Sequence, residues 1–131
     1  MPKDRLKPFQ QQISKPWGYE LILTGPDSPV TGKILHLNAG CRFSYQYHDQ
    51  KEEILTLVSG EATLVLEKEE ISMTPRHGYH IKPFCKHRVA AVSDCDIFEV
   101  STPEQGITVR LEDDYHRPDE TEKLRTASRR H

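Results

Sequence analysis

Residues Gly40 to Gly60 read GCRFSYQYHDQKEEILTLVSG, and the spacing of the polar residues in this stretch is the main indication of the fold. Gln46 and His48 are two residues apart, so on a β-strand their side chains point to the same face. The polar segment DQKE can turn the chain, after which Glu53 opens an apolar run that suits a neighbouring antiparallel strand. The stretch therefore predicts a strand pair in which Glu53 lies beside His48.

The rest of the chain repeats this pattern of short apolar segments separated by turn residues. The nearly regular spacing, without a convincing helical period, favours an all-β sandwich or barrel, and a jelly roll suits the length. We expect an N-terminal arm at residues 1–12, a single β domain at 13–116 and a flexible polar tail at 117–131. The expected strands lie within residues 19–24, 33–40, 53–60, 61–75, 79–84, 87–92, 95–102 and 107–113, and residues 61–75 form a hairpin with its turn at Glu67 to Glu70.

Length, charge and cysteine content argue against several classes of protein. The 131 residues suit one domain, and the formal net charge of -2 gives no reason to expect nucleic acid as a partner. No apolar run approaches the length of a membrane span, and the start MPKDRLKPFQQQ lacks the apolar core of a signal peptide. The 3 cysteines are odd in number and form no C-x-x-C pair, which argues against a disulfide framework and a four-cysteine zinc site. We therefore expect a cytoplasmic domain without membrane contact.

A second histidine extends the polar group of the opening stretch. His87 follows the segment KPFCK and begins another expected strand. If Gln46, His48, Glu53 and His87 converge, they offer a mixed set of nitrogen and oxygen ligands. Such a set suits one divalent ion such as Zn, Mn or Fe, with positions left open for water or substrate. The alternative is that His48 and Glu53 are surface residues of a polar turn.

The same spacing resembles the first motif of the cupin superfamily, which runs G, five residues, H-x-H, three or four residues, E, six residues, G. The chain matches every interval, with Gln46 in place of the first histidine. More narrowly, it resembles the C-terminal cupin domain of type II mannose-6-phosphate isomerases, in which glutamine is the usual occupant. That resemblance rests on KPWGYE (15–20), QYH (46–48), VSG (58–60), FEV (98–100) and VRLEDDYHR (109–117). It implies a single-domain cupin jelly-roll barrel or sandwich, with a metal held by Gln46, His48, Glu53 and His87.

The resemblance also implies an activity on a sugar or sugar phosphate. An aldose–ketose isomerase, or a related epimerase, moves a proton between adjacent carbons through an enediolate, which needs a base and an electrophile. The candidates for the base are Glu99, whose strand parity could place it inside, and His80. Glu99 could instead pair with Arg42 inside the barrel.

Cationic side chains are needed to hold the phosphate or the sugar hydroxyls. Lys33 and Arg110 match positions of the family pattern, and Arg42 shares the expected parity of the metal ligands. Arg110 is also a candidate member of the catalytic set. Its alternative role is an ion pair with Glu112 or Asp113 near a turn.

Some features depart from the family pattern and leave other functions open. The second cupin motif usually reads P-x-G-x-x-H, whereas this chain has KPFCKH, with Pro83 one place late and no glycine, so we expect a differently shaped loop before His87. One alternative is a regulatory or sugar-binding cupin with little catalysis. Another is a metal-dependent dioxygenase. That function predicts a site made mainly of histidines, so the set of Gln46, His48, Glu53 and His87 argues mildly against it.

The apolar residues of the opening stretch also predict an assembly. Ile54 and Val58 have the opposite parity to Glu53 and should lie on the outer face of the sheet. A second copy of the chain would cover such a face. We therefore expect a homodimer, with the N-terminal arm in a position to cross to the partner.

Overall fold

The computed structural model describes residues 8–129, which form short antiparallel strands and one helix. Their bounds are β1 (Gln11–Lys15), β2 (Gly18–Ile22), β3 (Thr31–Leu37), β4 (Tyr45–His48), β5 (Glu53–Ser59), β6 (Ala62–Leu66), β7 (Glu69–Ser72), β8 (Tyr79–Ile81), β9 (His87–Ala91), β10 (Cys95–Ser101), β11 (Thr108–Glu112) and α1 (Glu122–Ser128). The expected strands are confirmed, including the hairpin of residues 61–75. Within residues 8–129 no helix is long and apolar enough to cross a membrane.

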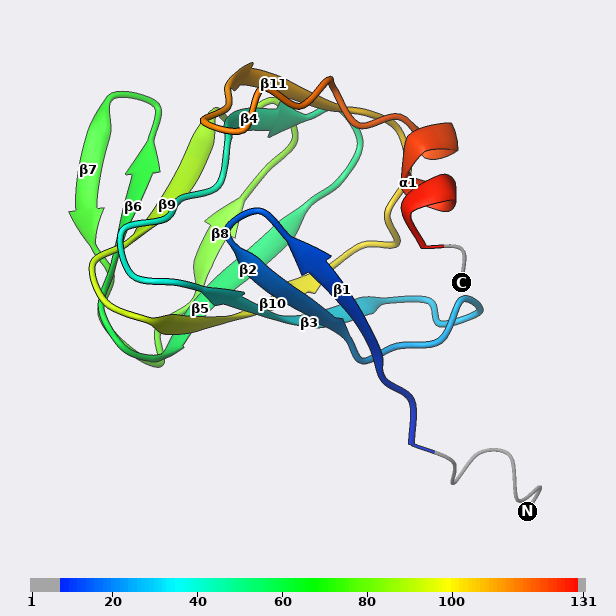
Figure 1. Cartoon of the computed structure of the whole chain (residues 1–131), viewed down its shortest axis with the longest axis horizontal. Helices are drawn as coiled ribbons and strands as arrows, with labels where there is room; N and C mark the ends of the chain where they lie inside the picture. The colour runs from blue at the N-terminus through cyan, green and yellow to red at the C-terminus, as the bar shows by residue number, and fades with distance from the viewer. Residues whose placement is uncertain (1–7, 130–131) are drawn as a thin grey trace.

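The strands form two sheets that face each other (Figure 1). The 6-stranded sheet has the order β1-β2-β3-β10-β5-β8, and the 5-stranded sheet has the order β11-β4-β9-β6-β7. Neighbours that are distant in sequence, such as β3 with β10 and β4 with β11, give the crossed connections of a jelly roll. The two sheets remain separate, so the architecture is the sandwich of the expected alternatives and not a closed barrel.

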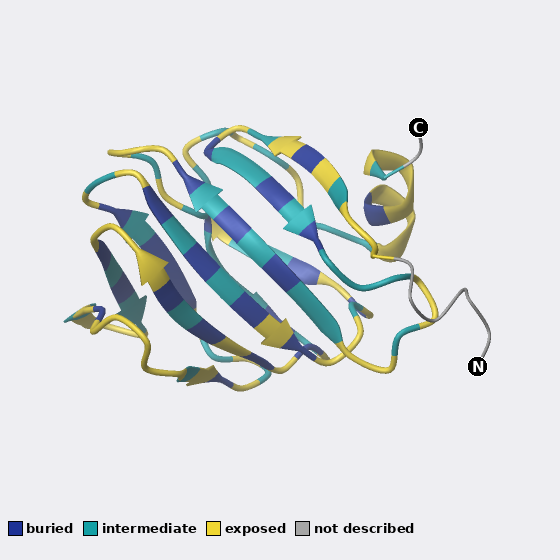
Figure 2. Cartoon of the chain, turned by 90° about the horizontal axis from the view of Figure 1, so that it is seen from below, coloured by how far each residue is buried: buried dark blue, intermediate teal, exposed yellow. Residues whose placement is uncertain are grey.

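Residues alternate between the inside and the outside along β3, β5 and β10 of the larger sheet (Figure 2). Leu37, Leu57 and Ile97 lie at the apolar end of the interior and are almost fully buried. Toward the other end, the inward positions of the same strands are charged, with Lys33 on β3, Glu53 on β5 and Glu99 on β10. The register pairs Glu99 with Lys33 across β3 and β10, so these charges lie side by side. The sandwich is therefore divided into an apolar half and a charged half.

The C-terminal segment contains a helix that the sequence analysis did not predict. Within residues 117–129 lies α1, which Thr121 caps by accepting a hydrogen bond from the backbone of Leu124. The flexibility of the tail stays a prediction, and residues 130–131 lie outside the described residues. Arg125 of this helix is buried, and Figure 1 shows α1 at the end of the sandwich opposite the β6–β7 hairpin. The helix was missed because it is short and lacks an apolar face, and because Arg125 and the capping Arg129 both pair with Glu104, a residue outside the helix.

The N-terminal arm differs in part from its expected bounds. Gln11 and Gln12, at the end of the arm, already belong to β1 and pair with β2 of the same chain. Residues 1–7 lie outside the described residues, so the expected crossing to a partner stays a prediction.

The outer face of the larger sheet carries the apolar residues that the homodimer prediction requires. Ile54 is 43% exposed and Val58 is 52% exposed, and Val100, the register partner of Ile54, is 42% exposed. We expect Ile54→Lys to weaken self-association at least about tenfold, because a charge in an apolar interface must be desolvated. Sedimentation velocity at micromolar concentration measures this. Val92→Lys is the control, since Val92 is 61% exposed but lies after β9, and a wild-type monomer would contradict the prediction.

Candidate metal centre and its cavity

Three buried side chains meet in the charged half of the sandwich. His48 ends β4, Glu53 begins β5 and His87 begins β9. The Nε2 atom of His87 lies 3.1 Å from Oε1 of Glu53, and Nε2 of His48 lies 3.6 Å from the same oxygen. The ligand atoms of these residues all lie within 4.8 Å of one another, so the group could hold a metal ion. The turn alternative for His48 and Glu53 is therefore wrong.

The other ring nitrogen of each histidine is held by a neighbour. Nδ1 of His87 donates to the backbone oxygen of Cys85 at 2.9 Å, and Nδ1 of His48 lies 2.8 Å from the hydroxyl of Thr108. Burial lowers the pKa of His48, which favours the neutral ring. Such partners fix the ring orientation and leave Nε2 available to a metal, so the donor set fits a divalent ion.

Gln46 stands beside this group, directly opposite His87 in the β4–β9 pairing. Its Nε2 lies 3.4 Å from Nε2 of His48, and its Oε1 accepts a hydrogen bond from the hydroxyl of Ser44 at 2.5 Å. A half turn of the terminal amide exchanges these two atoms and presents the oxygen to the histidines. Gln46 is thus placed where a fourth ligand would lie.

Two further charged residues surround Glu53. Burial raises the pKa of Glu53, but Lys51 and the hydrogen bonds from His48 and His87 outweigh burial and hold it well below its usual value. Nζ of Lys51 lies 3.3 Å from Oε2 of Glu53 and 2.9 Å from Oε2 of Glu99. Burial raises the pKa of Glu99 to about 7, against the attraction of Lys51. The ligand carboxylate is therefore charged, and a second carboxyl close by can hold a proton near neutral pH.

The other residues predicted for the site divide into two groups. Glu99, Lys33 and Arg110 line the same cavity as the histidines. Glu99 pairs with Lys51, not with Arg42, and Lys33 pairs with Glu20 at 2.5 Å. The guanidinium of Arg110 donates to the backbone oxygen of Pro118 at 2.6 Å and lies 3.4 Å from Glu120, so neither expected alternative partner holds it.

The predictions for Arg42 and His80 are wrong. Arg42 is exposed and forms a bidentate ion pair with Asp114 on the surface. Arg42 precedes β4 and forms only an isolated β-bridge with Ala90. The alternation of side chains along β4 therefore does not predict where Arg42 points. His80 lies on the outer side of β8, where its Nε2 contacts Glu52 at 2.5 Å, and its side chain is 48% exposed. Neither residue lines the cavity.

The cavity within these charged residues is small. Its volume is about 90 Å³, and Trp17, Phe43 and Leu55 form part of its wall. Ligand pockets in proteins usually have volumes of roughly 300–1,000 Å³. The cavity as it stands has room for a metal ion and a few waters, but a sugar does not fit without a movement of the wall.

The family model of the cupin domain matches residues 33–101, which run from within β3 to the end of β10 and include all the candidate ligands. The chain belongs to the cupin family. A search of curated proteins found no match. The narrower resemblance to type II mannose-6-phosphate isomerases stays a prediction.

Solved structures share the cupin fold of this chain at low sequence identity. A cupin 2 domain-containing protein from Halorhodospira halophila is 14% identical with a TM-score of 0.65, over 80% of this chain and 83% of that one. KdgF from Halomonas sp. is 17% identical with a TM-score of 0.63, over 74% and 89%. A cupin-superfamily sugar phosphate isomerase from Silicibacter pomeroyi is 18% identical with a TM-score of 0.60, over 72% and 67%. At these identities the likeness establishes the fold alone.

The loop of the second cupin motif keeps a glycine-like turn without a glycine. Phe84 occupies the place of the motif glycine, three residues before His87, and has a φ of 67°. Its backbone nitrogen donates to the backbone oxygen of His48 at 2.7 Å, which ties the loop to the first motif. The expected difference in loop shape from other cupins stays a prediction. Phe84 adopts the left-handed conformation at a cost of about 1–2 kcal/mol relative to glycine.

Lys51, Glu20 and Glu104 line the cavity and were not predicted from the sequence. Lys51 and Glu104 lie in connecting segments, where no periodicity indicates which side chains turn inward. Glu20 could have been found, because it lies two residues before the buried Ile22 on β2 and therefore shares its inward face. The loop residues carry no comparable signal.

Substitutions at Gln46 test whether its amide is a ligand. We expect Gln46→Ala to lower the affinity for a divalent ion by roughly tenfold, and Gln46→His to retain it, because imidazole supplies a donor at the same place. Metal content by mass spectrometry and titration calorimetry measure both effects. If neither substitution alters metal binding, Gln46 is not a ligand.

Proposed function

We propose that this cupin is a divalent-metal-dependent isomerase or epimerase of sugar phosphates, of the mannose-6-phosphate isomerase kind. The observation that carries the proposal is the arrangement within one cavity of four candidate ligands, a buried carboxyl and several cations. The ligands are Gln46, His48, Glu53 and His87, and the ion is Zn, Mn or Fe. When bound, such an ion supplies an electrophile that stabilises negative charge on the sugar oxygens during enolisation.

The other residues of the cavity have roles that suit this reaction. Glu99 is buried next to the ligand Glu53 and can take a proton from one carbon of the sugar and return it to the adjacent carbon. Lys51 lies between Glu53 and Glu99 and orients both carboxyl groups. Lys33 and Arg110 supply positive charge for the phosphate or for sugar hydroxyls. A solved cupin from Silicibacter pomeroyi is called a sugar phosphate isomerase, which agrees with this proposal.

Solvent exchange at the reacting carbon tests the proposal directly. The protein is loaded with Zn, Mn or Fe in turn and incubated with mannose 6-phosphate or fructose 6-phosphate in deuterium oxide. We expect deuterium to enter the sugar at the carbon next to the carbonyl, as detected by proton NMR. Glu99→Gln should reduce exchange by at least about a hundredfold with unchanged metal content, since a positioned base contributes roughly that much.

His80→Gln is the matched control, because His80 was the other candidate base and lies on the surface. It should leave exchange unchanged. A metal-loaded protein that binds the sugar phosphate without exchange would instead be a sugar-binding cupin. Consumption of dissolved oxygen in proportion to substrate would indicate a dioxygenase.

A further inference from the structure

A carboxylate from a connecting loop occupies the centre of the positive charge in the cavity. Glu104 lies in the loop that joins β10 to β11, and its side chain is only 11% exposed. It forms an ion pair with Lys33, and its Oε2 accepts from Nη1 of Arg129 at 2.5 Å. Nζ of Lys51 and Nε of Arg125 each lie 3.6 Å from the carboxylate. Four cations therefore surround one carboxylate, and we call them with Glu104 the Glu104 cluster.

Glu104 is not the only ion-pair partner of the cations in the cluster. Lys33 and Arg129 also contact Glu20, at 2.5 Å and 3.2 Å, and Lys51 also contacts Glu99. Burial raises the pKa of Glu104, but the surrounding cations hold it well below its usual value, so the group is an anion at neutral pH. If the Glu104 carboxylate moved away, the remaining carboxylates would still hold the cations in place. The charge that Glu104 had neutralised would then favour binding of another anion at the same position.

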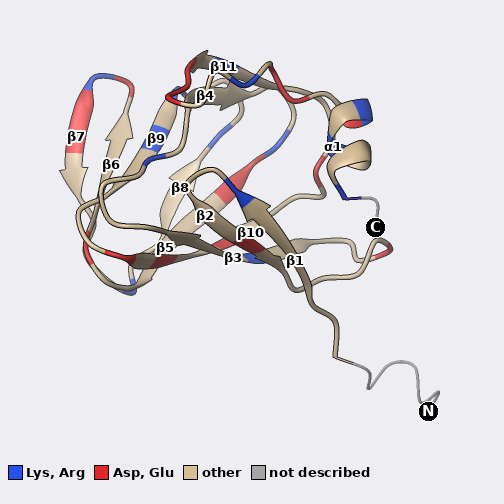
Figure 3. Cartoon of the chain, in the orientation of Figure 1, with Lys and Arg blue, Asp and Glu red and all other residues tan. Residues whose placement is uncertain are grey.

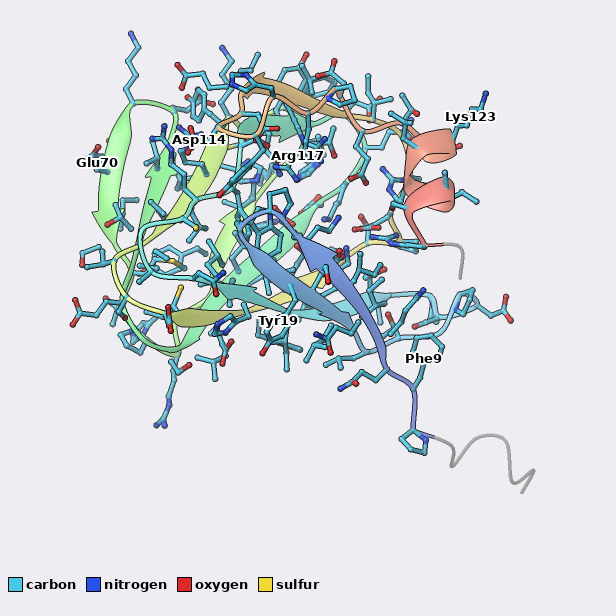
Figure 4. The ribbon with its side chains drawn as sticks, viewed as in Figure 1. Phe9, Tyr19, Glu70, Asp114, Arg117 and Lys123 are labelled. Atoms are coloured by element: carbon cyan, nitrogen blue, oxygen red, sulfur yellow. The ribbon has the colours of Figure 1, made fainter. Side chains whose placement is uncertain are left out.

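The cluster also separates two cavities. Lys33, Glu104, Arg125 and Arg129 line both the inner cavity, which contains the candidate metal ligands, and an outer cavity of about 580 Å³. The outer cavity is bordered by residues such as Phe9 and Thr24, and Figure 4 shows Phe9 near the N-terminal end of the chain. The cluster is therefore a wall whose displacement would join the small inner cavity to a larger space.

The elements that carry this wall are attached mainly by charge. Its two arginines are Arg125 on α1 and Arg129, which caps the C-terminus of α1, and no α1 residue belongs to the buried apolar core of the described chain. Leu124, the helix's large apolar residue, is 45% exposed. Figure 3 shows basic positions on α1 beside acidic positions of neighbouring segments. A polar ligand that competes for the same ion pairs can therefore displace the loop and the helix without exposing the core.

We propose that the four cations of the Glu104 cluster form the subsite for the anionic group of the substrate, a phosphate, and that Glu104 occupies it in the ligand-free protein. The inference rests on the proposed function and names the part of the site that recognises the phosphate. Lys51 joins the two parts, because it contacts Glu53 at the metal centre and Glu104 in the cluster. The reacting end of a sugar phosphate then lies at the metal and its phosphate replaces the Glu104 carboxylate.

Binding of inorganic phosphate to the metal-loaded protein tests this subsite without any sugar chemistry. We expect Glu104→Gln to bind phosphate at least about tenfold more tightly than wild type by titration calorimetry, since the ligand no longer competes with an internal anion. The control is Glu70→Gln, because Glu70 is exposed on β7 and lines neither cavity. It should bind phosphate as wild type does. Equal phosphate affinity in Glu104→Gln and wild type, or no binding by either, overturns the proposal.

Two measurements keep the test valid if Glu104→Gln does not fold. In wild type, saturating phosphate should speed hydrogen exchange at residues 102–107 and 122–128, and unchanged exchange there contradicts displacement of Glu104. Arg129→Gln should weaken phosphate binding about tenfold, whereas Lys123→Gln should not, because Lys123 on the same helix points to solvent (Figure 4). A failed isomerase assay with these phosphate results intact would reject the proposed reaction and leave the subsite standing.

Discussion

Replacing Glu53 with glutamine should lower the affinity of the protein for a divalent ion by about a hundredfold or more. Both histidine Nε2 atoms face Oε1 of Glu53, so an ion bound by the two histidines would also contact this oxygen. Glutamine retains the shape of the side chain but removes the charge that balances a cation. Titration calorimetry with Zn, Mn and Fe, and metal content after dialysis, measure the loss.

The adjacent residue provides a control for this substitution. Glu52 is exposed and pairs with His80 on the outer side of the sheet, so Glu52→Gln should leave metal binding unchanged. Circular dichroism separates loss of metal from loss of fold. A Glu53→Gln protein that is folded and retains wild-type metal content would show that the ion binds elsewhere.

Gly60→Ala should lower the free energy of unfolding by about 3 kcal/mol or more. Gly60 has a φ of 82°, and a Cβ atom there would lie 2.2 Å from the backbone oxygen of Asp94 and 2.8 Å from Cα of Cys95. Both neighbours are backbone atoms at the start of β10, so a side-chain rotation cannot relieve the contact. Denaturation in urea measures the change.

Gly25→Ala is the matched control for Gly60. A Cβ atom at Gly25 meets nothing within 4 Å, so the substitution should change the free energy of unfolding by less than about 0.5 kcal/mol. Equal stability of the two variants would show that the glycine ending the first cupin motif is not required for packing. The expected difference explains in physical terms why that motif ends in glycine.

The sequence predicted that the candidate ligands lie close together because they are on strands or at their ends. Alternation with a period of two placed Gln46 and His48 on one face, and the polar turn returned Glu53 beside them. The same rule predicted that Glu99 is buried. It failed for Arg42, where the strand had not yet begun, and was not applied to His80, whose neighbour Ile81 takes the inward position.

The sequence alone determined an all-β fold, the cupin motif and the candidate ligands, because these depend on local periodicity and on fixed spacing. The choice of a sandwich over a closed barrel came from the structure. Only the tertiary structure decided which charges surround the ligands. Glu104, Arg125 and Arg129 come from segments without periodicity, and they turn inward because partners from distant parts of the chain neutralise their charges. No local pattern records such pairing, so the cation cluster beside the candidate metal ligands could be found only once the two sheets and α1 were in place.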